Sequence, residues 1–258
     1  MSTQHMFEMN RPELEQTEAG LILNGICKEY RRFRLEPVYQ RVPPGRIVAL
    51  VGRNGAGKTT LLKTASGILQ PDAGEVILNG TLMIQSESRD STIAKSSIGY
   101  LPEQQIFYEW MTVARLLDFC SIIYPHWRMD MTLRLLDRFE LDHEQRVGEL
   151  SKGMRVKLGL IVALSHAPQA LLLDEPLTGL DPMSRATFMR ELDELVREMN
   201  CCCLVSSHDI EDFKKVSDSI WVLKDGKLSF EAMRSPGGEW ESNGVSIANI
   251  YEMLCEKM

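Results

Sequence analysis

Residues 52–60 read GRNGAGKTT and match the phosphate-binding loop pattern G-x-x-x-x-G-K-[ST]. Glycines in this pattern let the backbone turn tightly and bring its N–H groups close to phosphate oxygens. The pattern places Lys58 within reach of β- and γ-phosphates, and it gives Thr59 a hydroxyl that can hold Mg²⁺. An ordinary glycine-rich turn between a strand and a helix is the alternative interpretation, so the flanking segments have to decide.

The segments on both sides of this loop favour the phosphate-binding interpretation. Residues 47–51 (IVALV) form a short apolar run typical of a buried parallel strand, and residues 60–69 (TLLKTASGIL) predict a helix. Strands that alternate with helices along the rest of the chain predict an α/β fold with a largely parallel sheet. Further strands are predicted at residues 21–26, 76–80, 98–103, 170–173, 201–205 and in a hairpin over 220–228.

A block with helical periodicity begins at Thr112 and closes at Leu150, which predicts a helical insertion. Ser151 is a good N-cap for a helix over residues 152–165, and Asp181 followed by Pro182 marks another helix start. Residues 81–97 predict a variable loop or edge strand. Short helices are expected after His208 and over residues 247–257. We expect a flexible tail over residues 1–18, a core domain over 19–230 with a helical subdomain at about 104–165, and a C-terminal extension over 231–258.

The composition bounds the classes of protein that the chain can represent. With 258 residues, 44% hydrophobic and 25% charged, it is long enough for a substantial globular core. The formal net charge of −7 argues against sequence-independent nucleic-acid binding, so no nucleic-acid partner is expected. No apolar run approaches the roughly 18 residues that cross a bilayer, and the start lacks a signal-peptide pattern. We therefore expect a cytoplasmic protein that depends on another polypeptide for any membrane span.

The six cysteines include the triplet Cys201, Cys202 and Cys203. A metal site is one interpretation of the triplet, but it has no C-x-x-C partner and lies in a strand-like apolar run. Small buried side chains are the favoured interpretation. In a cytosol the cysteines should stay reduced.

Polar residues follow two of the predicted strands. Asp174 and Glu175 come directly after residues 170–173, and His208 follows residues 201–205 after two serines. Ligands of parallel-sheet proteins bind at the carboxyl ends of the strands, where the phosphate-binding loop also lies. Asp174 can hold Mg²⁺ through its water shell, Glu175 can orient or deprotonate an attacking water, and a histidine here can donate to a γ-phosphate. A charged strand-end turn and a structural histidine are the alternatives.

Five motifs, which follow one another along the chain in the family's order, give the chain a resemblance to the nucleotide-binding subunit of ABC transporters. Residues 52–60 resemble the Walker A loop, and LLLDEP at 171–176 resembles Walker B with the catalytic glutamate. LTGLD at 177–181 resembles the D-loop, and SSHD at 206–209 the switch-histidine loop. LSKGM at 150–154 resembles the family signature, usually LSGGQ. The implied fold is a P-loop NTPase cassette: a mostly parallel sheet core, an antiparallel β subdomain and an inserted helical subdomain.

The resemblance implies an ATPase that uses ATP and Mg²⁺ and couples hydrolysis to transport. It implies a homodimer that sandwiches two ATP molecules head to tail, attached to separately encoded transmembrane permease subunits at the inner face of the membrane. Catalytic roles fall on Glu175, His208 and Glu103, and metal binding falls on Thr59, Asp174 and Glu103. The implied nucleotide-binding residues are Tyr30, Gly52, Asn54, Gly55, Ala56, Gly57, Lys58, Thr59, Thr60, Ser151 and Gly153.

Three positions depart from the family pattern or leave alternatives open. Lys152 stands where the signature usually has glycine, which adds a positive charge near a phosphate. Glu103 stands where the family's Q-loop has glutamine, and Gln104 follows it, so the register is open by one residue. Tyr30 lies in the basic stretch KEYRRFR, where an adenine-stacking ring and an edge-strand aromatic are the two interpretations.

The subgroup that the chain most resembles is the ATPase subunits of bacterial ABC-2-type exporters, through YPHW at residues 124–127 and SSHDIEDFKKV at 206–216. Phe107, Tyr108 and Trp110 are candidates for contact with a permease, and packing of the insertion on the core is the alternative. A soluble ABC ATPase serving iron–sulfur cluster assembly is the alternative function. A GTPase is disfavoured because the N-K-x-D guanine motif is missing.

Overall fold

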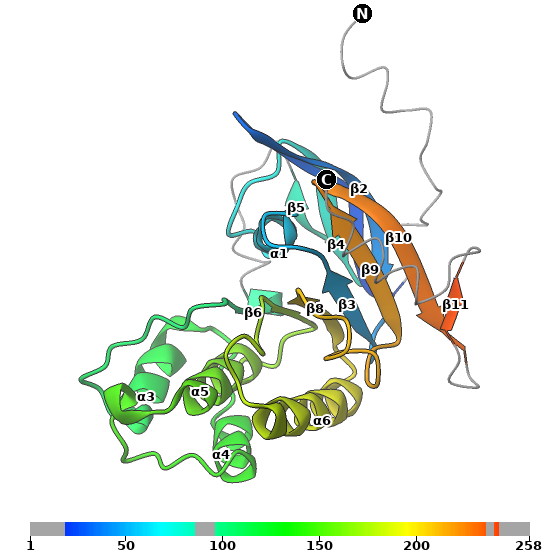
Figure 1. The fold of residues 1–258 in the computed structure, drawn as a ribbon. Coiled ribbons are helices and arrows are strands. Elements are labelled where there is room, and N and C mark those ends of the chain that lie inside the picture. Colours follow the sequence, from blue (N-terminus) through cyan, green and yellow to red (C-terminus); the bar gives the residue numbers. More distant parts are fainter. Residues whose placement is uncertain (1–18, 86–95, 236–239, 243–258) are drawn as a thin grey trace, which may run out of the picture.

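The computed structural model describes residues 19–85, 96–235 and 240–242, and it contains two β-sheets with helices packed around them (Figure 1). The strand order is β2-β1-β4-β5 in the smaller sheet and β11-β10-β9-β3-β8-β7-β6 in the larger one. The predicted tail at residues 1–18 and the predicted helix at 247–257 lie outside the described residues. The elements are β1 (Leu21–Tyr30), β2 (Phe33–Val42), β3 (Ile47–Val51), α1 (Lys58–Ala65), β4 (Ala73–Leu78), β5 (Thr81–Gln85), β6 (Ile98–Leu101), α3 (Val113–Ile123), α4 (Met129–Arg138), η3 (Val147–Glu149), α5 (Lys152–Leu164), β7 (Ala170–Leu173), α6 (Pro182–Met199), β8 (Cys202–Ser207), β9 (Ser219–Lys224), β10 (Lys227–Arg234) and β11 (Trp240–Ser242).

The larger sheet is parallel at its centre, as the alternation of strands and helices predicts. Strands β9, β3, β8, β7 and β6 run parallel to their neighbours, and β10 and β11 add an antiparallel edge. Strand β3 separates two cores, because alternate residues of a strand face opposite sides. Ile47, Ala49 and Val51 pack with the helices α3 to α6, whereas Val48 and Leu50 pack with α1 and the smaller sheet. Burial on both faces explains the uninterrupted apolar sequence of β3.

The smaller sheet is antiparallel and shares an apolar core with α1 and the larger sheet. Strand β4 starts at Ala73, three residues before the predicted start at residue 76. Gly74 has a φ of +85°, and a side chain there would collide with the backbone of Gly25. The glycine therefore serves a close approach of two strands at a register shift rather than a turn. Over residues 81–85 the predicted loop or edge strand is an edge strand, β5, and residues 86–95 of that prediction lie outside the described residues.

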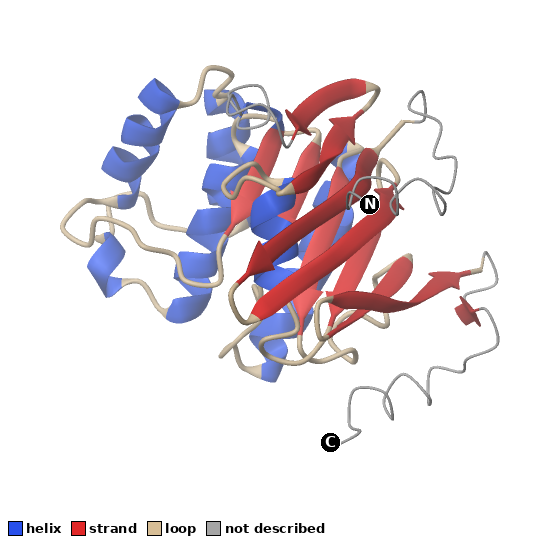
Figure 2. Ribbon diagram, turned by 90° about the horizontal axis from the view of Figure 1, so that it is seen from above, coloured by secondary structure: helices blue, strands red, loops and turns tan. Residues whose placement is uncertain are grey.

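The predicted helical insertion is present and gathers at one end of the molecule, where α3, α4 and α5 lie together (Figures 1 and 2). Thr112 caps α3 by accepting a hydrogen bond from the backbone N–H of Arg115. Ser151 caps α5 by accepting from Met154 at 3.3 Å, and Asp181 caps α6 with Pro182 as its first residue. Both predicted N-caps are confirmed.

One prediction for the segment between β8 and β9 differs from the structure. The segment after His208 forms consecutive turns, not the predicted short helix. Two polar side chains bond to the backbone there: Asp209 accepts from the N–H of Glu211, and the Ser217 hydroxyl donates to the carbonyl of Phe213, which also accepts from the N–H of Ser217. Strands β10 and β11 continue the larger sheet beyond residue 230, where a C-terminal extension was expected to begin. The predicted hairpin turn at Asp225 and Gly226 is confirmed, with a positive φ at both residues.

Candidate functional site

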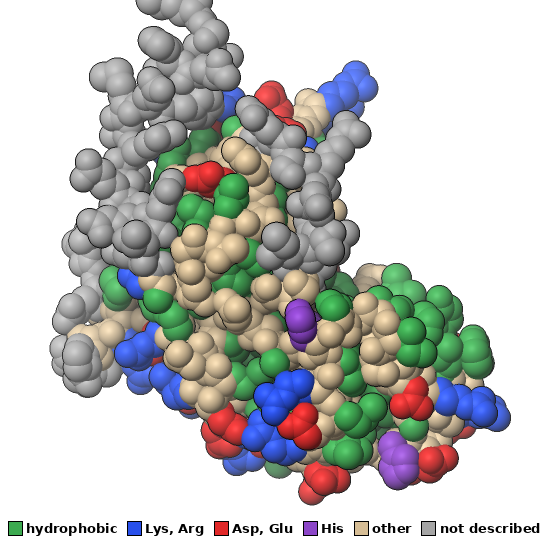
Figure 3. All heavy atoms as spheres, turned by 180° about the vertical axis from the view of Figure 1, so that it is seen from behind, with side chains coloured by type: hydrophobic (Ala, Val, Ile, Leu, Met, Phe, Trp, Pro, Cys, Tyr) green, Lys and Arg blue, Asp and Glu red, His purple; other side chains and the backbone are tan. Residues whose placement is uncertain are grey.

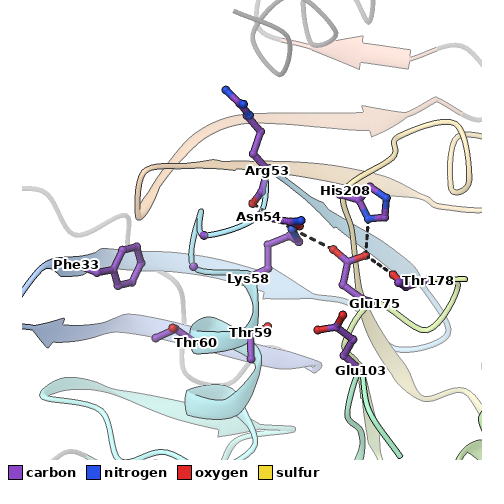
Figure 4. A pocket seen from close by; sticks show the side chains of 12 residues that line it. Phe33, Arg53, Asn54, Lys58, Thr59, Thr60, Glu103, Glu175, Thr178 and His208 are labelled. Atoms are coloured by element: carbon purple, nitrogen blue, oxygen red, sulfur yellow. Dashed lines mark hydrogen bonds and ion pairs between the residues drawn. The ribbon is translucent and has the colours of Figure 1, made fainter. Parts of the chain in front are cut away.

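A pocket of about 420 Å³ opens where the loop after β3 meets the carboxyl ends of β6, β7 and β8 (Figure 4). Its lining residues are far apart in the sequence, from Phe33 to His208. Of the predicted site residues, it contains Asn54, Gly55, Gly57, Lys58, Thr59, Thr60, Glu103, Glu175 and His208; Phe33, Arg53 and Thr178 complete the lining.

The loop before α1 is shaped to receive an anion. Gly57 precedes the helix with a φ of +108°, and no side chain caps the first N–H groups of α1. These amides and the positive end of the helix dipole attract negative charge. A side chain at Gly57 would also collide with the ring of Phe33, so only glycine fits here. Gly52 and Ala56 lie behind the loop and outside the lining, and Gly52 accepts a hydrogen bond from the Lys58 ammonium at 2.6 Å.

Lys58 and Glu175 form a buried ion pair across the pocket, with 3.1 Å between Nζ and Oε1. The other carboxylate oxygen of Glu175, Oε2, receives the Thr178 hydroxyl at 3.1 Å and lies 2.8 Å from Nδ1 of His208. Burial acts to raise the pKa of Glu175, but the hydrogen bond with His208 and the charge of Lys58 outweigh it and lower the pKa. Glu175 is therefore ionised at neutral pH.

The backbone of Glu175 is also held in place. It has a φ of +47°, a conformation that non-glycine residues seldom adopt. Its N–H donates to the hydroxyl of Ser206, which donates in turn to Asp174, each at 2.9 Å. Ser206 thus orients both acidic residues. The sequence prediction assigned it no role, and the signal that marks it is a polar residue on a buried strand beside two carboxylates.

The residues predicted to hold Mg²⁺, Thr59, Glu103 and Asp174, offer oxygen atoms, which suit a hard cation. Thr59 and Glu103 line the pocket, whereas Asp174 is only 2% exposed and lies behind the lining. In the described ranges, no three His, Cys, Asp or Glu side chains are grouped to hold a metal ion.

At two positions the structure places one of two neighbouring candidate residues in the pocket. Glu103 lines the pocket and Gln104 does not, which favours Glu103 for the role at this position. Phe33 lines the pocket at the start of β2, whereas Tyr30 does not line it. The two rings lie 6.3 Å apart, and Tyr30 is 45% exposed. The sequence prediction chose Tyr30 and overlooked Phe33 in the same aromatic stretch.

Ser151 and Gly153 do not join this pocket within one chain. Both lie at the start of α5, and Gly153 approaches Leu180 of the loop that follows Glu175. Apart from Tyr30, the structure therefore separates the predicted residues into two groups, one in or directly behind the pocket wall and one at the N-terminus of α5.

The cysteine triplet is part of the core. Cys201, Cys202 and Cys203 are buried and unpaired, and burial raises the pKa of Cys202 to about 11. The thiols therefore stay protonated and act as small apolar side chains, as predicted. The helices of the described chain include none with the length and apolarity of a membrane span.

Comparisons with known proteins agree with the motifs. The model of the family described as ABC transporter matches residues 35–178. The ABC transporter ATP-binding protein YxlF of Bacillus subtilis, itself uncharacterized, is 32% identical over 91% of this chain and 78% of its own length. The phosphonates import ATP-binding protein PhnC of Treponema denticola is 31% identical over 83% of this chain and 89% of its own length.

Solved structures show the same fold. An ATP-binding subunit of an ABC transporter superposes with a TM-score of 0.75 at 25% identity and covers 92% of this chain and 100% of its own. The cassette MJ0796, solved as a dimer with ADP and phosphate after hydrolysis, has a TM-score of 0.73 at 22% identity over 83% of this chain and 98% of its own. The expected fold class, a mostly parallel sheet with an antiparallel sheet and added helices, is confirmed.

Proposed function

Because this chain belongs to the ABC transporter family of ATP-binding proteins, which are ATPases, we propose that it is the motor subunit of a membrane transporter. The observation that carries the proposal is the pocket in which Lys58 and Glu175 meet above the unpaired amides of α1. Phosphoryl transfer to water needs a cation for the phosphates and a group that positions the water. Both stand here in one pocket.

ATP binding would use the features that attract an anion. The first amides of α1 and the Lys58 ammonium would hold the phosphates. Thr59, Glu103 and, through water, Asp174 would hold Mg²⁺, which when bound shields the negative charge that develops on the phosphates. Lys58 is then drawn to the phosphates, which releases Oε1 of Glu175. That oxygen can orient or deprotonate the attacking water, while Oε2 stays with Thr178 and His208.

Phe33 is the ring that we assign to the adenine, since it lines the pocket and Tyr30 does not. Phe33→Ala is expected to weaken ATP binding about tenfold, because stacking of a base on an aromatic ring contributes about 1–3 kcal/mol. Tyr30→Ala should change the dissociation constant less than about twofold. Titration of both variants with a fluorescent ATP analogue measures the effect, and a larger loss in Tyr30→Ala would return the role to Tyr30.

A second copy of the chain would complete each site. Ser151 and Gly153 lie outside the pocket of their own chain, and a helix N-terminus with a serine hydroxyl suits the γ-phosphate of a nucleotide held by a partner. We propose a homodimer with two ATP molecules at the interface. Binding of ATP would join the two protomers and hydrolysis would release them, which can drive attached membrane domains.

An exposed apolar surface on the helical subdomain is the proposed contact with the permease. We call it the helical-subdomain patch, and Figure 3 shows hydrophobic side chains gathered over this end of the molecule. Trp110 is 66% exposed, and Tyr108 contacts both Trp110 and Phe119 with ring centroids 6.1 Å apart. Phe107 packs against the core instead, which favours the alternative role for that residue. The patch consists of Ile106, Tyr108, Trp110, Phe119, Ile122 and Ile123.

Disruption of the patch tests the transporter assignment. Trp110→Glu is expected to reduce co-purification with a membrane permease at least about tenfold, since a charge is costly in an apolar interface. ATPase activity of the isolated chain should stay within about twofold, because the patch lies outside the pocket. Met233→Glu changes another exposed apolar side chain and serves as the matched control.

The same purification separates the candidate functions. Capture of a membrane protein by the wild-type chain supports the motor subunit, and its loss in Trp110→Glu supports the patch. Capture of soluble assembly proteins alone would support the soluble ABC ATPase. The ABC-2-type exporter subgroup stays a prediction, and relatives such as PhnC are named for import. Transport into inverted vesicles that carry the complex decides the direction.

A further inference from the structure

The loop after Glu175 supports that residue with a side chain of its own. The Thr178 hydroxyl donates to Oε2 of Glu175 at 3.1 Å, and the Thr178 N–H donates to the carbonyl of Glu175 at 3.2 Å. His208 contacts the same oxygen, and Lys58 lies against the other one. Thr178 therefore helps to decide which carboxylate oxygen of Glu175 faces the pocket.

The same loop receives the side chain of Lys152. Gly179 has a φ of +74°, and a methyl group on its Cα would lie 2.4 Å from Nζ of Lys152 and 3.2 Å from its Cε. The lysine stem thus lies across the bare backbone of Gly179. Lys152 is the first residue of α5, where the helix dipole disfavours a cation, so the helix itself gives the ammonium no support.

The remaining residues of this loop are held by burial and by a helix cap, so the contact between Lys152 and Gly179 acts on the part that is not held in this way. Leu177 and Leu180, which flank Thr178 and Gly179 in the sequence, are buried. Leu180 also lies against Gly153 at the start of α5. Asp181 then caps α6 by accepting from the backbone N–H of Ser184 at 3.0 Å. The crest, Thr178 and Gly179, is the part of the loop that Lys152 can restrain or release.

We propose that Thr178 is a positioning residue for Glu175, and that Lys152 restrains the Thr178 loop through Gly179. The inference rests on the proposed function, in which α5 of one protomer faces the nucleotide of the other. The nucleotide held by the partner attracts the Lys152 ammonium. This attraction changes how firmly Lys152 restrains the loop that carries Thr178. Nucleotide binding at the partner's site thereby affects the position of the Glu175 carboxylate in this protomer.

The role of Thr178 is tested by removing its hydroxyl at nearly constant shape. Thr178→Val should lower kcat about tenfold with KM changed less than about twofold, since a hydrogen bond to a charged group is lost. The acidic limb of the pH–rate profile should move to higher pH, because the hydroxyl favours the ionised carboxylate. Thr178→Ser should restore both values. A Thr178→Val enzyme with wild-type kcat and pH profile would overturn this role.

The link from Lys152 is tested by a double-mutant cycle in the full chain. Lys152→Ala should lower kcat about threefold alone and leave it unchanged in the Thr178→Val background, since coupled residues are non-additive. Lys152→Arg, which keeps both stem and charge, is the control. Amide hydrogen exchange without nucleotide should be faster at Thr178 and Leu180 in Lys152→Ala only. Equal effects of Lys152→Ala in both backgrounds would mean that Lys152 acts directly on phosphate and would overturn the link.

Failure of the proposed function gives a different pattern. If the wild-type chain does not hydrolyse ATP, or if Glu175→Gln leaves hydrolysis unchanged, then the assignment of Glu175 is wrong. If hydrolysis depends on Glu175 but the cycle is additive and hydrogen exchange is unaltered, then only the link is wrong.

Discussion

Glu175→Gln is expected to reduce steady-state ATP hydrolysis at least about a hundredfold, the usual loss on removing a general base. The carboxylate stands in the pocket with its pKa lowered, so it is ionised at neutral pH. The amide of glutamine keeps a similar shape but cannot take a proton from water. The proposed binding residues, such as Lys58 and Thr59, are unchanged, and ATP should therefore still bind and stay intact.

The consequence of intact ATP is a trapped dimer. Size-exclusion chromatography of Glu175→Gln with ATP and Mg²⁺ should show a dimer that the wild-type chain forms only transiently. Glu211→Gln removes a surface carboxylate outside the pocket and should behave as wild type in both measurements. Unchanged ATPase activity in Glu175→Gln would remove this residue from the mechanism, and loss of activity without a dimer would contradict the sandwich arrangement.

The predicted strands that matched the structure most closely are those with apolar residues on both faces. β3 and β7 have the predicted bounds, because a run such as IVALV is buried on either side and its ends are set by polar residues or glycine. The N-caps Ser151 and Asp181 were equally predictable, since capping depends on a few neighbouring residues. These local signals position most of the pocket.

Features that depend on contacts between distant segments were not predictable in the same way. Phe33 lines the pocket and Tyr30 does not, and there the ring of Phe33 lies against Gly57 of the phosphate-binding loop, far along the chain. Ser206 joins Asp174 to Glu175 only through the pairing of β7 with β8. The segment after His208, predicted as a helix, instead forms turns, in which the Asp209 side chain accepts from the backbone N–H of Glu211.

Lys58→Met is expected to weaken ATP binding at least about tenfold, because a buried cation that donates to phosphate is lost. It should also destabilise the empty protein by about 2 kcal/mol, since Glu175 loses its partner and stays buried. The value lies below that for a fully enclosed pair because the pocket is open to water and because His208 and Thr178 remain bonded to Glu175. Thermal unfolding with and without ATP measures both effects.

The pH dependence identifies the ion pair as the cause of the destabilisation. The folded-state pKa of Glu175 is below its ordinary value of 4.5, so its contribution to stability is present above that value and is lost as the pH falls through the folded-state pKa. The difference in Tm between wild type and Lys58→Met should therefore be full near pH 7 and shrink below about pH 4. The double variant Lys58→Met with Glu175→Gln, which leaves no unpaired charge, should recover most of the lost stability at neutral pH but not the ATP affinity. A Tm difference independent of pH, and unchanged in the double variant, would show that Lys58 contributes through packing and not through its charge on Glu175.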